Sequence, residues 1–229
     1  MTIESISDLA RQRSNHLWEE SFAHPFVQGI KSGALDLAKF RFYIKQDAYY
    51  VREFAKLHGR AAAQSDHPDT IAKLLHIGIG LAEGELQLHK SVFQALNISG
   101  KEWAAFRPAP IAYAYISHLY HVLAKGKLSY SLAALMPCPW LYDEVGEHLK
   151  DARPQAKVFQ DWIAEYSGED IKKNVRIERA LWDASSENAT EAERCEMIHI
   201  FMQSSFYELQ FWEMGWTQSD WSFIKEDAQ

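Results

Sequence analysis

Apolar side chains recur three or four residues apart along most of the chain, which is the spacing of an α-helix. Between residues 36 and 64, Phe40, Tyr43, Tyr50 and Phe54 form one such row. At the start of the chain, Ser5-x-x-Asp8 resembles a capping box. The pattern predicts helices over residues 2–22, 36–64, 68–97, 110–125, 128–136, 139–151, 155–166, 169–186 and 189–216.

The same pattern excludes a sheet and a division into domains. No segment combines sustained alternation, β-branched residues and hairpin turns, and no linker rich in glycine, serine or proline interrupts the chain. Several predicted helices are long enough for a bundle. We therefore expect one all-α domain, a single-domain helical bundle over residues 1–229.

The last predicted helix is apolar on most sides, as its stretch IHIFMQSSFYELQFWEMGW shows. A helix with so little polar surface belongs deep in a core or beneath another subunit. Together with the aromatic rows on other helices, this favours a homo-oligomer.

Composition narrows the class of protein further. Apolar residues make up 47% of the chain, which indicates a folded globular protein, and the formal charge of −7 disfavours nucleic-acid binding. The first residues lack a secretory signal, and no apolar stretch is long enough to span a membrane. Two cysteines do not make a disulfide framework, so we expect free thiols in a reducing cytoplasm.

Residues 135–142 read LMPCPWLY, which places Cys138 between two prolines. Proline disfavours helical geometry in the residue before it and is favoured at the first helical position. We therefore expect a helix to begin at Pro139, with Cys138 extended as its N-cap. There a thiol meets unpaired N–H groups and the positive end of the helix dipole, which favour a reactive thiolate. The alternative is a buried, inert cysteine, whereas Cys195 lies mid-helix without such a setting.

Two carboxylates interrupt apolar helix faces. Glu208 shares its face with Phe211 and Trp212, and apolar surroundings raise the pKa of a carboxyl toward that of a proton donor. Alternatively, that face is less buried than the pattern suggests. Asp47 is the single acid in an aromatic row. Such an acceptor suits an amino-bearing heterocycle, although a structural aspartate bonded to a tyrosine hydroxyl fits equally well.

Helical bundles can hold di-iron sites, which require two Glu-x-x-His pairs and further carboxylates. The chain contains one such pair, Glu196–His199. We therefore expect no dedicated metal site.

Five segments together resemble the TenA family, the thiaminase II enzymes. They are HPFVQGI, QDAYYVREFAKLHGRAAA, AYAYISHLY, ALMPCPWLYDEVGEHL and SSFYELQFWEM, in the family's order between about residues 24 and 214. Cys138 matches the branch of the family that has a catalytic cysteine. The resemblance implies a haem-oxygenase-like all-α fold that binds no haem, metal or other cofactor and is assembled as a homotetramer. It also implies a small-molecule partner, thiamin or its aminomethyl-aminopyrimidine degradation product. It further implies hydrolysis that releases hydroxymethylpyrimidine.

The resemblance also implies a role for each matched residue. Cys138 would add to the pyrimidine ring, Glu208 would protonate a ring nitrogen, and Asp47 would hold the exocyclic amine and adjoining nitrogen. The remaining roles are pocket hydrogen bonds from Tyr50 and Tyr142, contact with the cysteine by Tyr115, orientation of Glu208 by Tyr166, and stacking on the ring by Phe211. Tyr142 has independent support, because it lies four residues after Cys138, on the same side of the helix.

Two other functions share this fold. One relative oxidises a ring with oxygen and no cofactor, and Cys138 and Glu208 argue against that chemistry here. The other is a non-catalytic pyrimidine-binding or regulatory protein. The lack of a basic surface argues only against regulation by direct DNA binding.

Overall fold

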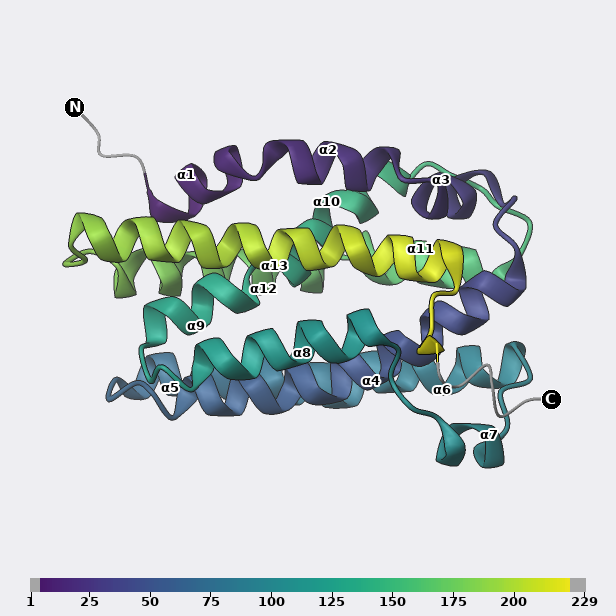
Figure 1. Ribbon diagram of the computed structural model, residues 1–229, viewed down its shortest axis with the longest axis horizontal. Coiled ribbons are helices and arrows are strands. Elements are labelled where there is room, and N and C mark those ends of the chain that lie inside the picture. The colour runs from purple at the N-terminus through teal and green to yellow at the C-terminus, as the bar shows by residue number, and fades with distance from the viewer. Residues whose placement is uncertain (1–4, 223–229) are drawn as a thin grey trace.

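The computed structural model describes residues 5–222, and at residues 85, 86, 88 and 89 it describes the backbone alone. The ends of the predicted domain and the predicted helix start at residue 2 lie outside this range. Within it the regular elements are helices, which confirms the all-α prediction (Figure 1). The first half contains α1 (Ile6–Arg13), α2 (Asn15–Ala23), α3 (Pro25–Ser32), α4 (Leu37–Ala62), α5 (Pro68–Gly80), the π-helical turn η1 (Leu81–Glu85), α6 (Leu86–Ala95) and α7 (Gly100–Ala105). The second half contains α8 (Pro110–Leu123), α9 (Leu128–Leu135), α10 (Pro137–Leu149), α11 (Lys157–Tyr166), α12 (Glu169–Ser185) and α13 (Glu191–Thr217).

The N-terminal region is more divided than predicted. The cap is confirmed, since the Ser5 hydroxyl accepts a hydrogen bond from the Asp8 N–H at 3.1 Å. The single helix expected to reach residue 22 breaks at Ser14, whose backbone leaves helical geometry at φ −91° and ψ 2°. A further helix, α3, was not predicted, although His24 caps it and Pro25 opens it.

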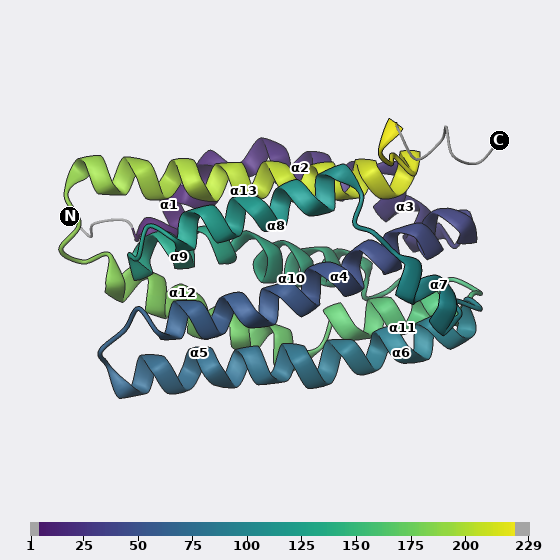
Figure 2. The same ribbon diagram turned by 60° about the horizontal axis from the view of Figure 1, so that its bottom comes forward.

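A π-helical turn divides the long helix predicted over residues 68–97. Turn η1 lies between α5 and α6, and all three pack against α4 along one edge of the molecule (Figure 2). The connection between α6 and α8 contains the short helix α7, which was also not predicted. Such π-helical turns are frequent at functional sites.

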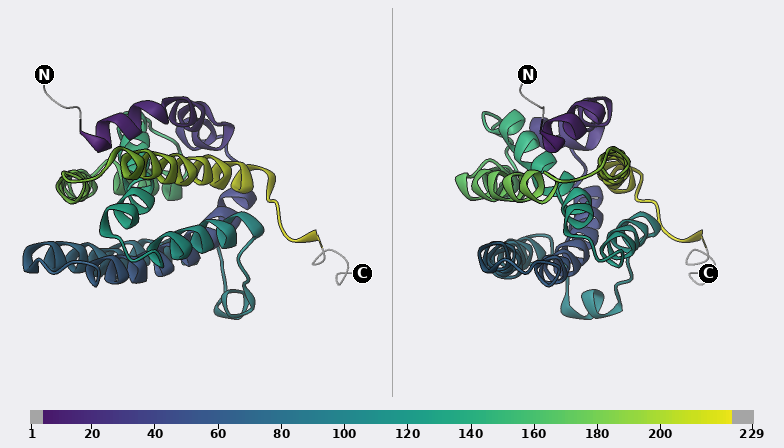
Figure 3. Two further views of the ribbon diagram at one scale, coloured as in Figure 1. Left: turned by 60° about the vertical axis from the view of Figure 1, so that its left-hand side comes forward. Right: turned by 90° about the vertical axis from the view of Figure 1, so that its left-hand side faces the viewer.

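Helix α13 occupies the core, as its apolar sequence predicted. It packs against α1–α4 and α8–α10, and it buries Phe201 and Trp212 completely. The view along the molecule in Figure 3 shows α1 and α2 on one side of α13 and α8 on another. Among the large apolar side chains of the two neighbouring helices α13 and α8, Phe206 and Tyr113 are exposed.

One hydrophobic core connects residues from α1 to α13. In the part of the chain that the structure describes, no helix is both long enough and apolar enough to cross a membrane.

Candidate functional site

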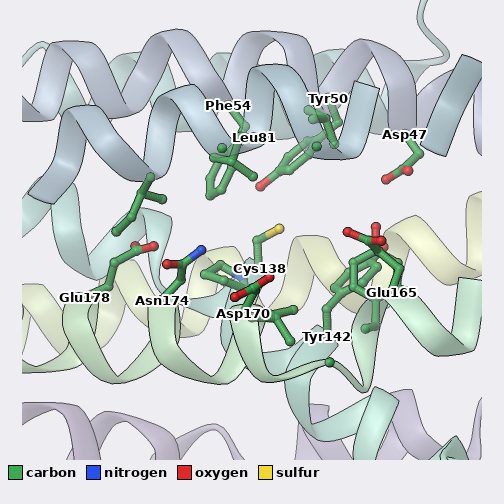
Figure 4. Close-up of a pocket in the computed structure, with 18 of the residues that line it drawn as sticks. Asp47, Tyr50, Phe54, Leu81, Cys138, Tyr142, Glu165, Asp170, Asn174 and Glu178 are labelled. Atoms are coloured by element: carbon green, nitrogen blue, oxygen red, sulfur yellow. The ribbon is translucent and has the colours of Figure 1, made fainter. Parts of the chain in front are cut away.

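A cavity of about 850 Å³ lies between α4, α5 and η1 on one side and α10 and α12 on the other, with residues of α8 and α13 completing its wall (Figure 4). This volume is typical of small-molecule sites. The eight site residues predicted from the sequence all line it. They are Asp47, Tyr50, Tyr115, Cys138, Tyr142, Tyr166, Glu208 and Phe211.

Helix α4 forms one wall through residues spaced by helical turns. Asp47, Tyr50 and Phe54 are three and four residues apart and therefore share one face. The rings of Tyr50 and Phe54 stack with centroids 5.2 Å apart. The Asp47 side chain is buried beside this aromatic wall. The aromatic row seen in the sequence is therefore both core packing and cavity lining.

Cys138 differs from its prediction. It lies within the first turn of α10, which begins at Pro137, so it is neither extended nor the N-cap, and Met136 takes the cap position. Both prolines fit there, although proline has no N–H to donate. The first hydrogen bond of the turn runs from the Trp140 N–H to the Met136 carbonyl, so no earlier N–H needs a partner in the helix. The preference against helical geometry before Pro139 is overridden.

The Cys138 thiol keeps the electrostatic setting predicted for it, although its position in the helix differs. Cys138 is partly buried, lines the cavity, and remains at the N-terminal turn of α10, where the helix dipole favours negative charge. It also lies within hydrogen-bonding reach of Glu208. Tyr142, four residues further along α10, is on the cavity side as predicted.

Glu208 is a buried acid with a strongly raised pKa. Its side chain is 2% exposed, so the buried alternative is correct. Burial, together with the nearby Asp47, raises its pKa from 4.5 to about 8, although hydrogen bonds from Tyr115 and Cys138 act in the opposite direction. At neutral pH the group is therefore a carboxylic acid that can donate a proton.

Tyr115 holds this acid in place. Its hydroxyl donates a hydrogen bond of 2.7 Å to Glu208 Oε1. Burial, reinforced by the neighbouring Glu208, raises the pKa of Tyr115 well above its usual range, so the phenol keeps its proton. The resemblance implied that Tyr115 contacts Cys138. A charge interaction between these two side chains agrees with that position. Orientation of Glu208 by Tyr166 stays a prediction.

The remaining predicted residues form an aromatic wall. The Tyr142 hydroxyl bonds to that of buried Tyr43 at 2.9 Å. Tyr166 packs edge-on against Tyr142 with centroids 4.7 Å apart, and Phe211 meets Tyr50 at 5.8 Å. These contacts fix the rings that a flat ligand would touch.

Polar residues of α12 that line the cavity were missed, among them Asn174 and Glu178. His58 on α4 is buried next to Glu178 of α12, and Asn174 lies one turn before Glu178. A signal existed in the sequence: Glu178 lies three residues after Val175 and four before Trp182, hence on the buried face of α12.

Cys195 and the pair Glu196–His199 do not line the cavity. Cys195 is exposed, and Glu196 pairs with Lys125 at 2.7 Å. Across the described residues, no group of three or more His, Cys, Asp and Glu side chains is arranged to hold a metal ion.

Comparison with known proteins agrees with this geometry. Residues 11–218 match the model of the TENA/THI-4/PQQC family. The chain belongs to this family. The aminopyrimidine aminohydrolase of Bacillus subtilis (strain 168) is 40% identical over 217 residues, which are 95% of this chain and 92% of that protein.

Solved structures extend the comparison to the fold. The TenA homologue protein from P. horikoshii OT3 is 27% identical, with a TM-score of 0.85 over 93% of this chain and 99% of that one. A domain of unknown function from Shewanella denitrificans OS217, described as having a heme oxygenase-like fold, is 15% identical. It has a TM-score of 0.73 over 99% of this chain and 97% of that one. The haem-oxygenase-like fold is thereby confirmed.

Proposed function

We propose that this TenA-family protein is an aminopyrimidine aminohydrolase. It releases hydroxymethylpyrimidine from aminomethyl-aminopyrimidine, from thiamin, or from both. The observation that carries the proposal is the meeting of Cys138 with a protonated Glu208 in one cavity. The 40% identity to an aminopyrimidine aminohydrolase over almost the whole chain supports the same reaction.

Binding begins with Asp47 and the aromatic walls. One oxygen of the Asp47 carboxyl group accepts a hydrogen bond from the exocyclic amine, and a proton between its other oxygen and the adjoining ring nitrogen completes the pair. The faces of Phe211 and Tyr50 enclose the flat ring, and Tyr142 and Tyr166 complete the pocket. Buried walls around the ring lower the local dielectric and thereby strengthen each polar contact.

The reaction needs a nucleophile because an aromatic pyrimidine releases its substituent poorly. The Cys138 thiolate forms a bond to a ring carbon, and the displaced ring electrons take the proton of Glu208 at a ring nitrogen. Protonation at that step avoids a build-up of negative charge in the ring.

The second half of the reaction reverses these transfers. The exocyclic C–N bond breaks, and the protonated amine or the thiazolium leaves with the electron pair as ammonia or the neutral thiazole. Water attacks the exposed exocyclic carbon and releases a proton to solvent, so that this carbon becomes the hydroxymethyl group. Loss of the Cys138 thiolate then restores the aromatic ring, and Glu208 takes its proton back from the ring nitrogen.

An assay of product formation tests the enzyme against the alternative of a non-catalytic binder. The protein is incubated with aminomethyl-aminopyrimidine and, separately, with thiamin, and hydroxymethylpyrimidine is followed by chromatography. We expect catalytic turnover of at least one substrate. Binding of both compounds without product would identify a binding or regulatory protein instead.

The proposal includes a cytoplasmic homotetramer that does not bind nucleic acid. The net charge of −7 supports the absence of a phosphate-binding surface. Phe206 and Tyr113, exposed on adjacent helices α13 and α8, support burial between subunits. Sedimentation of wild type and of a Phe206→Ser variant measures the assembly, and we expect the substitution to weaken it.

A further inference from the structure

The cavity is longer than a pyrimidine ring. Helix α4 lines it from Asp47 to Phe54, and His58, one turn further on, contacts the cavity residue Glu178. His58 is eleven positions after Asp47 on this helix, which corresponds to about 16 Å along the axis. Figure 4 shows Asp47 and Glu178 at opposite ends, with Cys138 between them.

The far half of the cavity has one polar and one apolar wall. Asp170, Asn174 and Glu178 follow one another at four-residue intervals on α12 and face the cavity (Figure 4). Asp170 is exposed, Asn174 is half-buried, and Glu178 is buried, with 1% of its surface exposed. Phe54 and Leu81 line the opposite wall. This combination suits a flat heteroaromatic group that ends in a polar atom.

The buried end contains an ion pair that leaves one oxygen unused. His58 Nδ1 lies 3.0 Å from the Phe54 carbonyl, which can only accept, so Nδ1 carries a proton. His58 Nε2 lies 3.5 Å from Glu178 Oε1. Burial alone would lower the pKa of His58, but the attraction of Glu178 outweighs it and raises the pKa, which favours an imidazolium.

Glu178 Oε2 has no hydrogen-bond partner among the described residues. A buried acceptor without a donor is costly, so its position in a ligand cavity indicates that a ligand supplies one. Because His58 already balances the charge of Glu178, a neutral hydroxyl fits this oxygen better than a second cation.

The orientation of the ring directs the leaving group toward this end. If Asp47 and Glu208 hold the two ring nitrogens, the carbon opposite the methyl-bearing carbon points away from both. That carbon carries the exocyclic methylene and the leaving group. A long leaving group therefore lies in the part of the cavity between Cys138 and Glu178.

We propose that the far end of the cavity is a leaving-group subsite in which Glu178 Oε2 accepts a hydrogen bond from a terminal hydroxyl on an extended heteroaromatic leaving group. This inference rests on the proposed function. The hydroxyethyl-thiazolium of thiamin has this chemistry, whereas the ammonia released from aminomethyl-aminopyrimidine is too short to reach Glu178. Glu178 is thus a specificity-determining residue for the longer substrate.

The test compares kcat/KM for both substrates in the wild type, Glu178→Met and Glu178→Gln. We expect Glu178→Met to lower kcat/KM for thiamin about tenfold and to change that for aminomethyl-aminopyrimidine by less than about twofold. Glu178→Gln keeps an acceptor oxygen and should lose less. The matched control is Glu169→Gln, an acid at the exposed rim of the same cavity, which should leave the ratio of the two values unchanged.

A thiamin analogue with an ethyl group in place of the hydroxyethyl completes the test. It should be a poorer substrate than thiamin for the wild type and equal to thiamin for Glu178→Met. Equal loss for both substrates, or no loss for thiamin, would overturn the subsite. If the wild type turns over neither compound, the proposed function fails; calorimetric binding of thiamin and its ethyl analogue to the wild type and Glu178→Met then tests the subsite alone.

Discussion

The Tyr115 hydroxyl donates a hydrogen bond of 2.7 Å to Oε1 of Glu208, and both side chains are buried. Because a protonated carboxyl carries its hydrogen on one oxygen, donation to Oε1 favours the acid with its proton on Oε2. The phenol thereby selects which oxygen of Glu208 can give a proton to a substrate. In the proposed mechanism Tyr115 is a positioning residue, and Glu208 is the proton donor.

Tyr115→Phe should change the pH profile as well as the rate. The hydrogen bond from Tyr115 lowers the pKa of Glu208, so its loss raises that pKa above about 8. The alkaline limb of kcat/KM, where Glu208 loses its proton, should therefore move to higher pH. We expect kcat at the optimum to fall about tenfold because the acid loses its orientation.

Tyr113→Phe is the matched control, because Tyr113 is on the same helix but does not line the cavity. Its pH profile should equal that of the wild type. An alkaline limb that moves to lower pH in Tyr115→Phe would contradict the role given to this hydrogen bond.

Glu208 should also make stability depend on pH. Its pKa is about 8 in the folded protein, against 4.5 ordinarily, so between these values the folded state retains a proton that the unfolded chain has released. The contribution of Glu208 to the free energy of unfolding therefore falls as pH rises from about 4.5 to about 8. Glu208→Gln lacks this titration.

Thermal unfolding of the wild type and Glu208→Gln measures this effect at several pH values. The Tm of the variant minus that of the wild type should increase from pH 5 to pH 8. A constant difference across that range would show that Glu208 is not the titrating group.

Gly146 of α10 should not tolerate a side chain. A Cβ atom there would lie 1.9 Å from the Tyr166 carbonyl oxygen, which belongs to the backbone of α11. Gly146→Ala should therefore force the two helices apart and lower the free energy of unfolding by about 2–4 kcal/mol. Since Tyr166 lines the cavity, turnover should fall as well.

Gly59 provides the control for this substitution. It lies inside α4, and a Cβ atom there would meet no other atom within 4 Å. Gly59→Ala should stabilise the protein by about 0.5–1 kcal/mol, because alanine loses less backbone entropy in a helix. Denaturant unfolding of both variants measures the contrast, and similar stabilities would contradict the close packing of α10 on α11.

Helical spacing made much of this site predictable. Asp47 and Tyr50 could be assigned to one helix face because a long row of aromatic residues surrounds them, and the pattern of α13 indicated a buried Glu208. The family resemblance then connected these faces with Cys138. All of these residues line one cavity.

Features that depend on tertiary packing could not be predicted in the same way. The break at Ser14 and the π-helical turn η1 lie in stretches with uninterrupted helical spacing. At Cys138 the local preference before proline indicated an extended residue, but α10 already begins at Pro137. The pairing of His58 with Glu178 joins α4 to α12, and neither residue's own surroundings in sequence indicate the other.

The central claim is that Cys138 is the nucleophile of a pyrimidine hydrolase. Its most direct test is the kcat for hydroxymethylpyrimidine formation from aminomethyl-aminopyrimidine by the wild type, Cys138→Ser and Cys195→Ser. Cys195 is the matched control because it is the other cysteine and lies outside the cavity. We predict that Cys138→Ser lowers kcat more than about 100-fold while Cys195→Ser retains the wild-type rate. Equal turnover by the wild type and Cys138→Ser would contradict the assignment.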